Sequence, residues 1–206
     1  MLNAKRLERI DATLDRKQPT LQLFLDNVDS SQNISAIIRS ADAVGVFHLY
    51  YSNAKNAEVK THKTITQGTH RWLEKKLVNS ADKVTFLKAK QKEGFQIVAT
   101  HLEAKSVSFR SIDYTKPTIV VVGNEKEGVS EEVLSVANEV IVIPMQGMAQ
   151  SLNVSVATAL ILYEAERQLE EKGFYEVPQL SLEKRREIKE AWIYRDLISR
   201  RSKGRL

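Results

Sequence analysis

Short apolar segments alternate along this chain with longer segments of helical pattern. TIVVV at 118–122 and VIVI at 140–143 are rich in β-branched residues and lack polar alternation, which is typical of strands buried on both faces. Other strands are predicted at 20–26, 46–51, 71–78 and 96–100. Helices are predicted at 3–16, 34–44 and 80–91, from about 130, and from about 153. This alternation predicts an α/β fold with a mainly parallel sheet and helices on both faces.

The two ends of the chain read as additions to one moderate domain. Pro19 closes the first helix, and a linker at 173–179 containing Pro178 precedes the last one. We therefore expect an N-terminal helical extension at 1–19, an α/β domain at 20–175 and a basic C-terminal helical extension at 176–206.

Composition excludes several kinds of site. The 206 residues include no cysteine, which rules out disulfides, thiolate metal ligands and cysteine nucleophiles. The four histidines are scattered, so no metal site is expected. The N-terminus has no apolar signal core, and no window approaches the length of a membrane span. We expect a soluble, cytoplasmic protein with no membrane partner.

The formal net charge of +5 is concentrated at the C-terminus. Residues 182–206 contain nine Lys or Arg against four acids, together with Trp192 and Tyr194. Such a tail suits a polyanion such as RNA, through phosphate neutralisation and stacking, although a solvated basic helix face is an open alternative. The cations expected to contact RNA, from both ends of the chain, are Arg9, Arg16, Lys184, Arg185, Arg195 and Arg200.

A ligand site is predicted where the strands end. Ligands of parallel sheets bind at the carboxyl ends of the strands, which gathers Thr100, Val122 and Ile143 around one pocket. After Pro144, the small residues of GMAQS at 147–151 allow a close backbone approach, and Ser151 or Asn153 can cap the following helix. Strand, loop and helix of this kind also occur as bare scaffold, and that alternative stays open at this point.

Two further polar segments adjoin strand ends or helix starts. NISAIIR at 33–39 carries Arg39, most simply a phosphate or carboxylate binder, and GNEKEG at 123–128 carries the carboxylate of Glu125. The glycine spacing of GNEKEG mimics a P-loop, but Val129 and Ser130 replace the Lys-Ser/Thr pair that should follow. No strand is followed by the dinucleotide fingerprint of a Rossmann fold either.

In their order and wording these segments resemble a known family. NISAIIRSADAVGV, IVVVGNEKEGVS and VIPMQGMAQSLNVSVATALILYEAERQ are similar to the three signature motifs of the SpoU (TrmH) family of RNA 2′-O-ribose methyltransferases, in the SPOUT class. The resemblance spans residues 16–175. RKQP at 16–19 and FRSIDYTKPT at 109–118 resemble the branch that methylates the D-loop guanosine at tRNA position 18.

The resemblance implies a fold that periodicity does not indicate. In the family the segment corresponding to 145–153 is threaded through a preceding loop to form a deep trefoil knot, which binds S-adenosylmethionine, and two subunits pair across it. The residues implied to bind the cofactor are Thr100, Gly123, Ile143, Met148, Ser151 and Leu152. Those implied to form the catalytic centre are Asn33, Arg39, Glu125, Ser151 and Asn153.

The resemblance also leaves alternatives. Arg39 could act as a base, position a phosphate or lower the pKa of the ribose hydroxyl, while Asn33 and Asn153 could each be simple helix caps. The substrate could be ribosomal RNA or another tRNA position, and a non-catalytic RNA-binding assembly factor could share the fold. Many ribosomal RNA enzymes of the family carry an extra N-terminal RNA-binding domain, for which little room precedes Asn33; we therefore expect tRNA.

Overall fold

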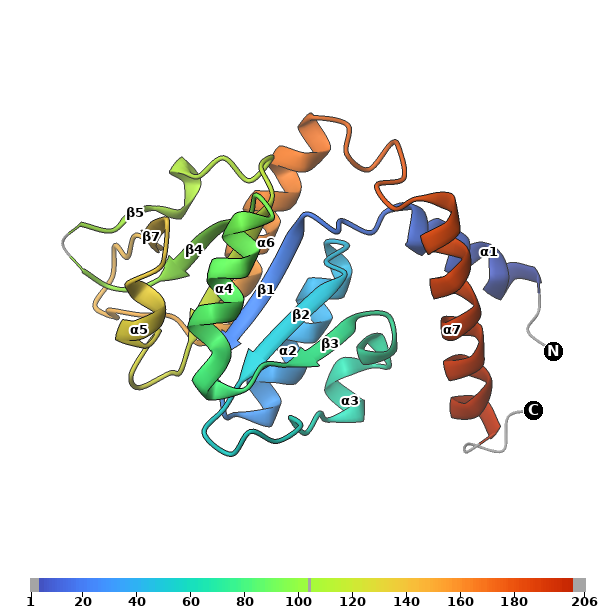
Figure 1. Ribbon diagram of the computed structural model, residues 1–206, viewed down its shortest axis with the longest axis horizontal. Helices are drawn as coiled ribbons and strands as arrows, with labels where there is room; N and C mark the ends of the chain where they lie inside the picture. Colours follow the sequence, from blue (N-terminus) through green and yellow to red (C-terminus); the bar gives the residue numbers. More distant parts are fainter. Residues whose placement is uncertain (1–3, 104, 202–206) are drawn as a thin grey trace.

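The computed structural model, which describes residues 4–103 and 105–201, contains a seven-stranded sheet in which every pairing is parallel (Figure 1). The strand order is β3-β2-β1-β6-β4-β7-β5. The strands are β1 (Leu21–Asp26), β2 (His48–Ser52), β3 (Glu74–Leu77), β4 (Gln96–Thr100), β5 (Val107–Ser108), β6 (Thr118–Gly123) and β7 (Glu139–Val142). The predicted α/β fold with a parallel sheet is confirmed.

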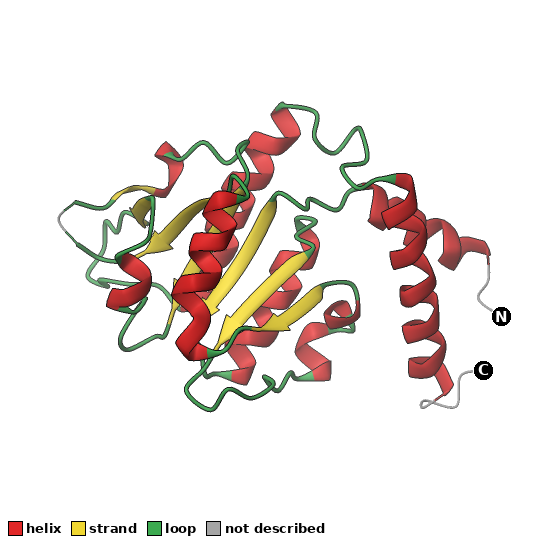
Figure 2. Ribbon diagram, in the orientation of Figure 1, coloured by secondary structure: helices red, strands yellow, loops and turns green. Residues whose placement is uncertain are grey.

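Helices cover both faces of the sheet, with α2 and α6 on one face and α4 and α5 on the other (Figure 2). The α-helices are α1 (Ala4–Asp15), α2 (Ser31–Ala43), α3 (Lys63–Thr66), α4 (Lys83–Lys92), α5 (Glu131–Leu134), α6 (Val154–Glu171) and α7 (Leu182–Arg201). Single 3-10 turns lie at Thr69–Arg71, Ser80–Asp82 and Phe109–Ser111. None of the described helices is long and apolar enough to cross a membrane.

The central strands β1 and β6 supply side chains to two separate cores. Leu23 and Val120 belong to the cluster under α2 and α6, whereas Phe24 and Val121 belong to the cluster under α4 and α5. All four are fully buried. Because successive side chains of a strand point to opposite faces, burial on both faces requires the continuous apolar runs seen in the sequence.

The strand order changes direction next to β1. From β1 the chain adds β2 and β3 on one side, and then returns to build β6, β4, β7 and β5 on the other. Ligands of open parallel sheets bind at the carboxyl edge beside such a switch. The topology thus directs attention to the ends of β6, β4 and β7.

The helices from the two ends of the chain pack against each other at one end of the molecule (Figure 1). Trp192 of α7 is 0 % exposed and lies in a cluster with Ile10 and Leu14 of α1 and Phe47 beside β2. Its burial contradicts the predicted stacking of Trp192 on RNA, since an indole within an apolar core cannot meet a base. The helices of the two expected extensions, α1 and α7, form a single helical pair.

Several predicted boundaries shift. The strand expected at 71–78 begins only at Glu74, because residues 69–71 form a 3-10 turn, and the helix expected near residue 130 is a single turn, α5. The two-residue β5 was not predicted, because so short a pairing leaves no periodic signal. The expected helix start at Asn3 and the basic residues Lys203 and Arg205 lie outside the described part of the chain.

Candidate active site

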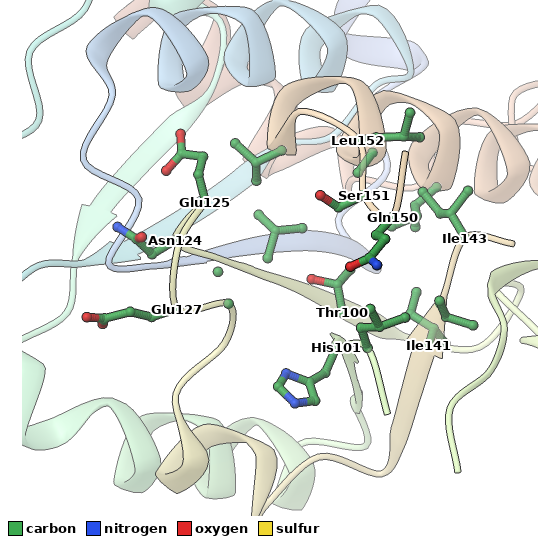
Figure 3. A pocket seen from close by; sticks show the side chains of 18 of the residues that line it. Thr100, His101, Asn124, Glu125, Glu127, Ile141, Ile143, Gln150, Ser151 and Leu152 are labelled. Atoms are coloured by element: carbon green, nitrogen blue, oxygen red, sulfur yellow. The ribbon is translucent and has the colours of Figure 1, made fainter. Parts of the chain in front are cut away.

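A pocket of about 350 Å³ opens at the carboxyl ends of β4, β6 and β7, where the sequence predicted it (Figure 3). Its lining comes from those strand ends, the loop after β6, and the segment that leads into α6. The lining residues are Thr100–Leu102, Val122–Gly128, Ile141–Ile143, Met145, Gln150–Leu152, Val154, Ala157 and Ile161.

The pocket combines an apolar wall with acidic groups. Figure 3 shows the side chains of Ile141 and Ile143 at one end of the pocket and the carboxylates of Glu125 and Glu127 at the other. Apolar walls with a few oriented polar groups are typical of sites for drug-sized ligands. Lys126 also lines the pocket, so the arrangement suits a ligand that has both an apolar part and polar or charged groups.

The loop after β6 is closed on itself by the backbone. The N–H groups of Asn124 and Gly128 each donate to the other residue's carbonyl oxygen, at 3.0 and 2.9 Å. A Cβ on Gly123 would lie 2.0 Å from the carbonyl carbon of Gly128, so only glycine fits at position 123. Gly128 has a φ of +74°. The two glycines of GNEKEG therefore permit the tight loop that forms one side of the pocket.

Three polar side chains from distant parts of the sequence form a hydrogen-bonded chain beside the pocket. Nδ2 of Asn33, in the first turn of α2, donates to Oε1 of Glu125. Nδ2 of Asn153 donates to Oδ1 of Asn33 at 3.1 Å. The structure thus brings together Asn33, Glu125 and Asn153, one from each predicted motif.

Of the two predicted asparagine caps, one is a cap. Asn153 is the N-cap of α6, and its Oδ1 accepts from the N–H of Ser155 at 2.9 Å. The N-cap of α2 is Ser30, whose hydroxyl accepts from the N–H of Asn33. The side chain of Asn33 is therefore available to Glu125 and Asn153, whereas Asn153 caps its helix and bonds Asn33 at the same time.

The other predicted site residues divide into those at the pocket and those away from it. Thr100, Gly123, Ile143, Ser151 and Leu152 line the pocket. Met148 does not line it and is 101 % exposed in the single chain, so its contact with the cofactor stays a prediction. A Cβ at Gly147 would meet nothing within 4 Å in the single chain, so the close backbone approach expected there also stays a prediction.

Arg39 lies six residues beyond Asn33 on α2, which is about 9 Å along the helix axis. Its side chain is exposed and has no hydrogen bond or ion pair to any residue that the structure describes. The structure does not bring Arg39 into contact with Asn33 or Glu125. An uncommitted guanidinium on this helix remains available to an anionic partner.

The cations predicted to contact RNA are partly occupied by acids of the protein. Arg185 pairs with Asp15 of α1 at 2.5 Å, Arg195 pairs with Glu74 at 3.2 Å, and Lys184 pairs with Glu187 at 2.8 Å. Arg9 and Arg16 are exposed and have no ion pair within the described chain. Arg200 belongs to α7, but its side chain lies outside the description.

Sequence reasoning missed several residues of the pocket. His101 and Leu102 follow the predicted strand end at Thr100, and Asn124 and Glu127 stand within the predicted GNEKEG loop, so their position next to a strand end was the available signal. Ala157 and Ile161 lie further along α6, in a largely apolar segment that gives no signal of a ligand. Among the described residues no group of three or more His, Asp or Glu could hold a metal ion.

Comparisons with known proteins agree with this geometry. The model of the SpoU rRNA Methylase family matches residues 20–163. The tRNA (guanosine(18)-2′-O)-methyltransferase of Aquifex aeolicus is 52 % identical over 200 residues, which are 97 % of this chain and 93 % of that protein. The enzyme of the same name from Escherichia coli K12 is 45 % identical over 84 % of this chain and 75 % of its own length.

Solved structures of SpoU methyltransferases are also similar to this chain. The crystal structure of the A. aeolicus TrmH/SpoU tRNA modifying enzyme superposes with a TM-score of 0.89 at 52 % identity and covers 93 % of this chain and 96 % of that one. The AdoMet complex of the SpoU methyltransferase AviRb from Streptomyces viridochromogenes has a TM-score of 0.66 at 30 % identity, over 82 % of this chain and 65 % of that one. With its pocket, its three motifs and these relatives, the chain belongs to the SpoU family of RNA methylases.

Proposed function

We propose that this protein is an S-adenosylmethionine-dependent methyltransferase that modifies the ribose 2′-hydroxyl of the D-loop guanosine at tRNA position 18. The observation that carries the proposal is the pocket at the ends of β4, β6 and β7, joined to the Asn33–Glu125–Asn153 chain. The tRNA specificity rests on relatives named tRNA (guanosine(18)-2′-O)-methyltransferase, which are 43–52 % identical over most of this chain.

The residues of the pocket fit the cofactor. Ile143 and Leu152 offer an apolar surface for the adenine, backbone groups near Thr100 and Gly123 can meet its polar edge, and Ser151 also lines the pocket. Glu125 and Glu127 outnumber Lys126 in the lining, which leaves a net negative charge that favours a cationic ligand. The bound cofactor supplies an electrophilic methyl group on a positively charged sulfur.

The chain's own residues align the acceptor and manage its proton. Asn33, Glu125, Ser151 and Asn153 hold the guanosine ribose so that its 2′-oxygen faces the methyl group. A guanidinium cation has no lone pair with which to take up a proton, so we assign Arg39 to a substrate phosphate and to stabilising the developing 2′-oxyanion by its charge. The hydroxyl proton passes to that phosphate or to solvent water as the bond from oxygen to the methyl group forms and the bond from sulfur to the methyl group breaks.

We propose that two copies pair through α6 and the segment before it. Met148 is fully exposed, and α6 also exposes the apolar side chains of Val156, Leu160 and Tyr163. Val156, Leu160 and Tyr163 share one face of α6 by their spacing, and a row of exposed apolar residues marks an interaction surface. Threading of residues 145–153 into a trefoil knot, as in the family, is part of the same proposal.

Binding of tRNA involves the ends of the chain. We propose that residues 20–175 form the SPOUT methyltransferase domain, while 1–19 and 176–206 extend the RNA-binding surface. Arg9, Arg16 and those cations of α7 that are not in ion pairs with acids of the protein supply the positive charge. Because the substrate is tRNA, we place the protein's action in the cytoplasm.

The proposal is tested with radiolabelled methyl donor and unmodified tRNA transcript, followed by mapping of the modified nucleotide. We expect methylation at guanosine 18 and none in a matched transcript that carries 2′-deoxyguanosine at that position. Arg39→Ala should abolish transfer while calorimetric binding of S-adenosylmethionine persists. Modification at another tRNA position, or of ribosomal RNA alone, would refute the substrate assignment, and full activity of Arg39→Ala would refute the role of Arg39.

A further inference from the structure

A buried carboxylate lies beneath the pocket loop and is not part of the proposed catalytic centre. Asp26, the last residue of β1, is 0 % exposed. Its Oδ2 accepts from the N–H of Ser130 at 2.9 Å and from the Ser130 hydroxyl at 2.6 Å. Its Oδ1 accepts from Nζ of Lys83 at 2.9 Å and from the Ser52 hydroxyl at 3.3 Å.

The partner cation is buried as well. Lys83, the first residue of α4, is 1 % exposed and also donates to the Ser130 hydroxyl at 3.0 Å, while its ion pair with Glu132 is 2.7 Å long. Burial lowers the pKa of Lys83, but hydrogen bonds and attraction to Glu132 and Asp26 outweigh burial and raise that pKa above its usual value. The lysine is therefore charged at neutral pH.

This cluster joins the two ends of the loop that carries Glu125. In the sheet Asp26 is the register partner of Gly123, which precedes the loop at 124–129, and its carboxylate binds Ser130, which follows it. The Asn124 side chain ties the same loop to the carbonyl oxygen of Asn27 at 3.0 Å. The position of the loop, and with it of Glu125, is thus defined from β1.

The side chain of Ser130 holds the end of the loop and does not cap a helix. Ser130 is the N-cap residue of α5, yet its side chain makes no capping bond, because the hydroxyl donates to Asp26 and accepts from Lys83. Packing alone would not require such an arrangement, since a buried ion pair adds little stability over apolar side chains of similar volume. The directional hydrogen bonds instead fix the position of Ser130, and with it the end of the loop, relative to Asp26.

We infer that Asp26, Lys83 and Ser130 are positioning residues, which hold the loop at 124–129 against the cofactor pocket and so set where Glu125 meets Asn33. The inference rests on the proposed function for its link to catalysis, but the holding of the loop can be measured without it.

The first test uses Ser130→Ala, which removes the hydroxyl and leaves the N–H bond to Asp26. We expect the Kd for S-adenosylmethionine, measured by calorimetry, to rise by about tenfold and kcat to fall by a similar factor, the effect of a slightly misplaced site. KM for tRNA should stay unchanged. In a Glu125→Ala background the same substitution should leave kcat unaltered, because the residue through which it acts is gone.

The second test separates position from stability. Lys83→Met alone leaves the Asp26 carboxylate buried without its cation and should lower the melting temperature, whereas Asp26→Leu combined with Lys83→Met removes both charges and should restore much of it. Cofactor affinity should not recover in the double variant. Glu132→Gln removes only the exposed partner of Lys83 and serves as the matched control, with affinity unchanged.

Amide hydrogen exchange of the cofactor-free protein gives a readout that does not depend on activity. The amides of Lys126 and Gly128, both hydrogen-bonded within the loop, should exchange faster in Ser130→Ala and at the wild-type rate in Glu132→Gln. Unchanged exchange and unchanged affinity in Ser130→Ala would overturn the inference. A different outcome would refute the proposed function and leave the inference about the loop intact. In that outcome the amides exchange faster in Ser130→Ala, but the wild-type protein neither binds the cofactor nor methylates tRNA.

Discussion

Oδ1 of Asn33 accepts a 3.1 Å hydrogen bond from Nδ2 of Asn153, although 120 residues separate the two side chains. The first residue belongs to the helix after β1 and the second to the N-cap of α6. Through Asn33 this contact extends to Glu125 at the pocket. The three motifs of the sequence therefore meet in one hydrogen-bonded chain of side chains. Substitution of one of these residues should affect the positions of the other two.

Substitution of Asn153 can separate its two roles. Asn153→Asp keeps an oxygen that accepts from the Ser155 N–H, and Asp is a good N-cap residue, so the free energy of unfolding should change little. Asp cannot donate to Asn33, and methyl transfer should fall by about 10- to 100-fold. Asn153→Ala should lose the activity and also about 1 kcal/mol of stability. Urea unfolding and single-turnover kinetics measure the two effects; equal activity in Asn153→Asp and wild type would contradict this role.

Salt dependence should distinguish free from paired cations. Arg9→Ala or Arg16→Ala removes an exposed cation that has no ion pair among the described residues, so each should weaken tRNA binding and lower the slope of log Kd against log salt by about one. Lys184→Ala removes a cation already paired with Glu187 and should change the slope less. Filter binding over a range of salt concentrations gives the slopes, and identical slopes for all three variants would refute a direct contact at Arg9 and Arg16.

Trp192 should act through stability and not through stacking on RNA. Trp192→Ala opens a cavity between α1, α7 and Phe47 and should cost about 3–5 kcal/mol of unfolding free energy. Tyr194→Ala, at a side chain 67 % exposed on the same helix, should cost less than about 0.5 kcal/mol. Denaturant titrations of both variants are the measurement. A stable Trp192→Ala protein with weakened tRNA binding would argue for the stacking role that the structure contradicts.

Tyr114 should make the protein sensitive to alkaline pH. Burial, assisted by Glu164, raises the pKa of Tyr114 above its usual value near 10.0, and its hydroxyl donates to the carbonyl oxygen of Phe109 at 3.0 Å. Below pH 10 the phenol is protonated in both states and contributes no pH dependence. Above pH 10 the unfolded chain loses this proton first, so stability falls as pH rises.

The matched variant is Tyr114→Phe. Relative to it, wild-type stability should be constant from pH 7 to 9.5 and then decline by about 1.4 kcal/mol per pH unit. Urea unfolding at each pH measures the difference. Parallel curves for the two proteins up to pH 11 would show that the phenol ionises equally well in the folded state.

Local pattern determined the architecture. Runs such as TIVVV at 118–122 can be buried only between two layers of helices, which predicts a parallel sheet, and the carboxyl ends of those strands form the pocket. Thr100, Val122 and Ile143 were predicted there because the position of a strand end follows from its sequence. Family resemblance implied that Asn33, Glu125 and Asn153 belong to one centre, whereas the hydrogen bonds between them come from the fold.

Tertiary structure alone decided which predicted side chains face a ligand, the solvent or the core. Composition placed Trp192 on a basic helix, but only the packing of α7 on α1 buries it, and only the course of the chain after Pro144 turns Met148 outward. The pairing of Asp26 with Lys83 joins residues 57 positions apart and has no periodic signature. Sequence periodicity records which face of an element is buried, whereas a contact between distant elements depends on how the whole chain packs.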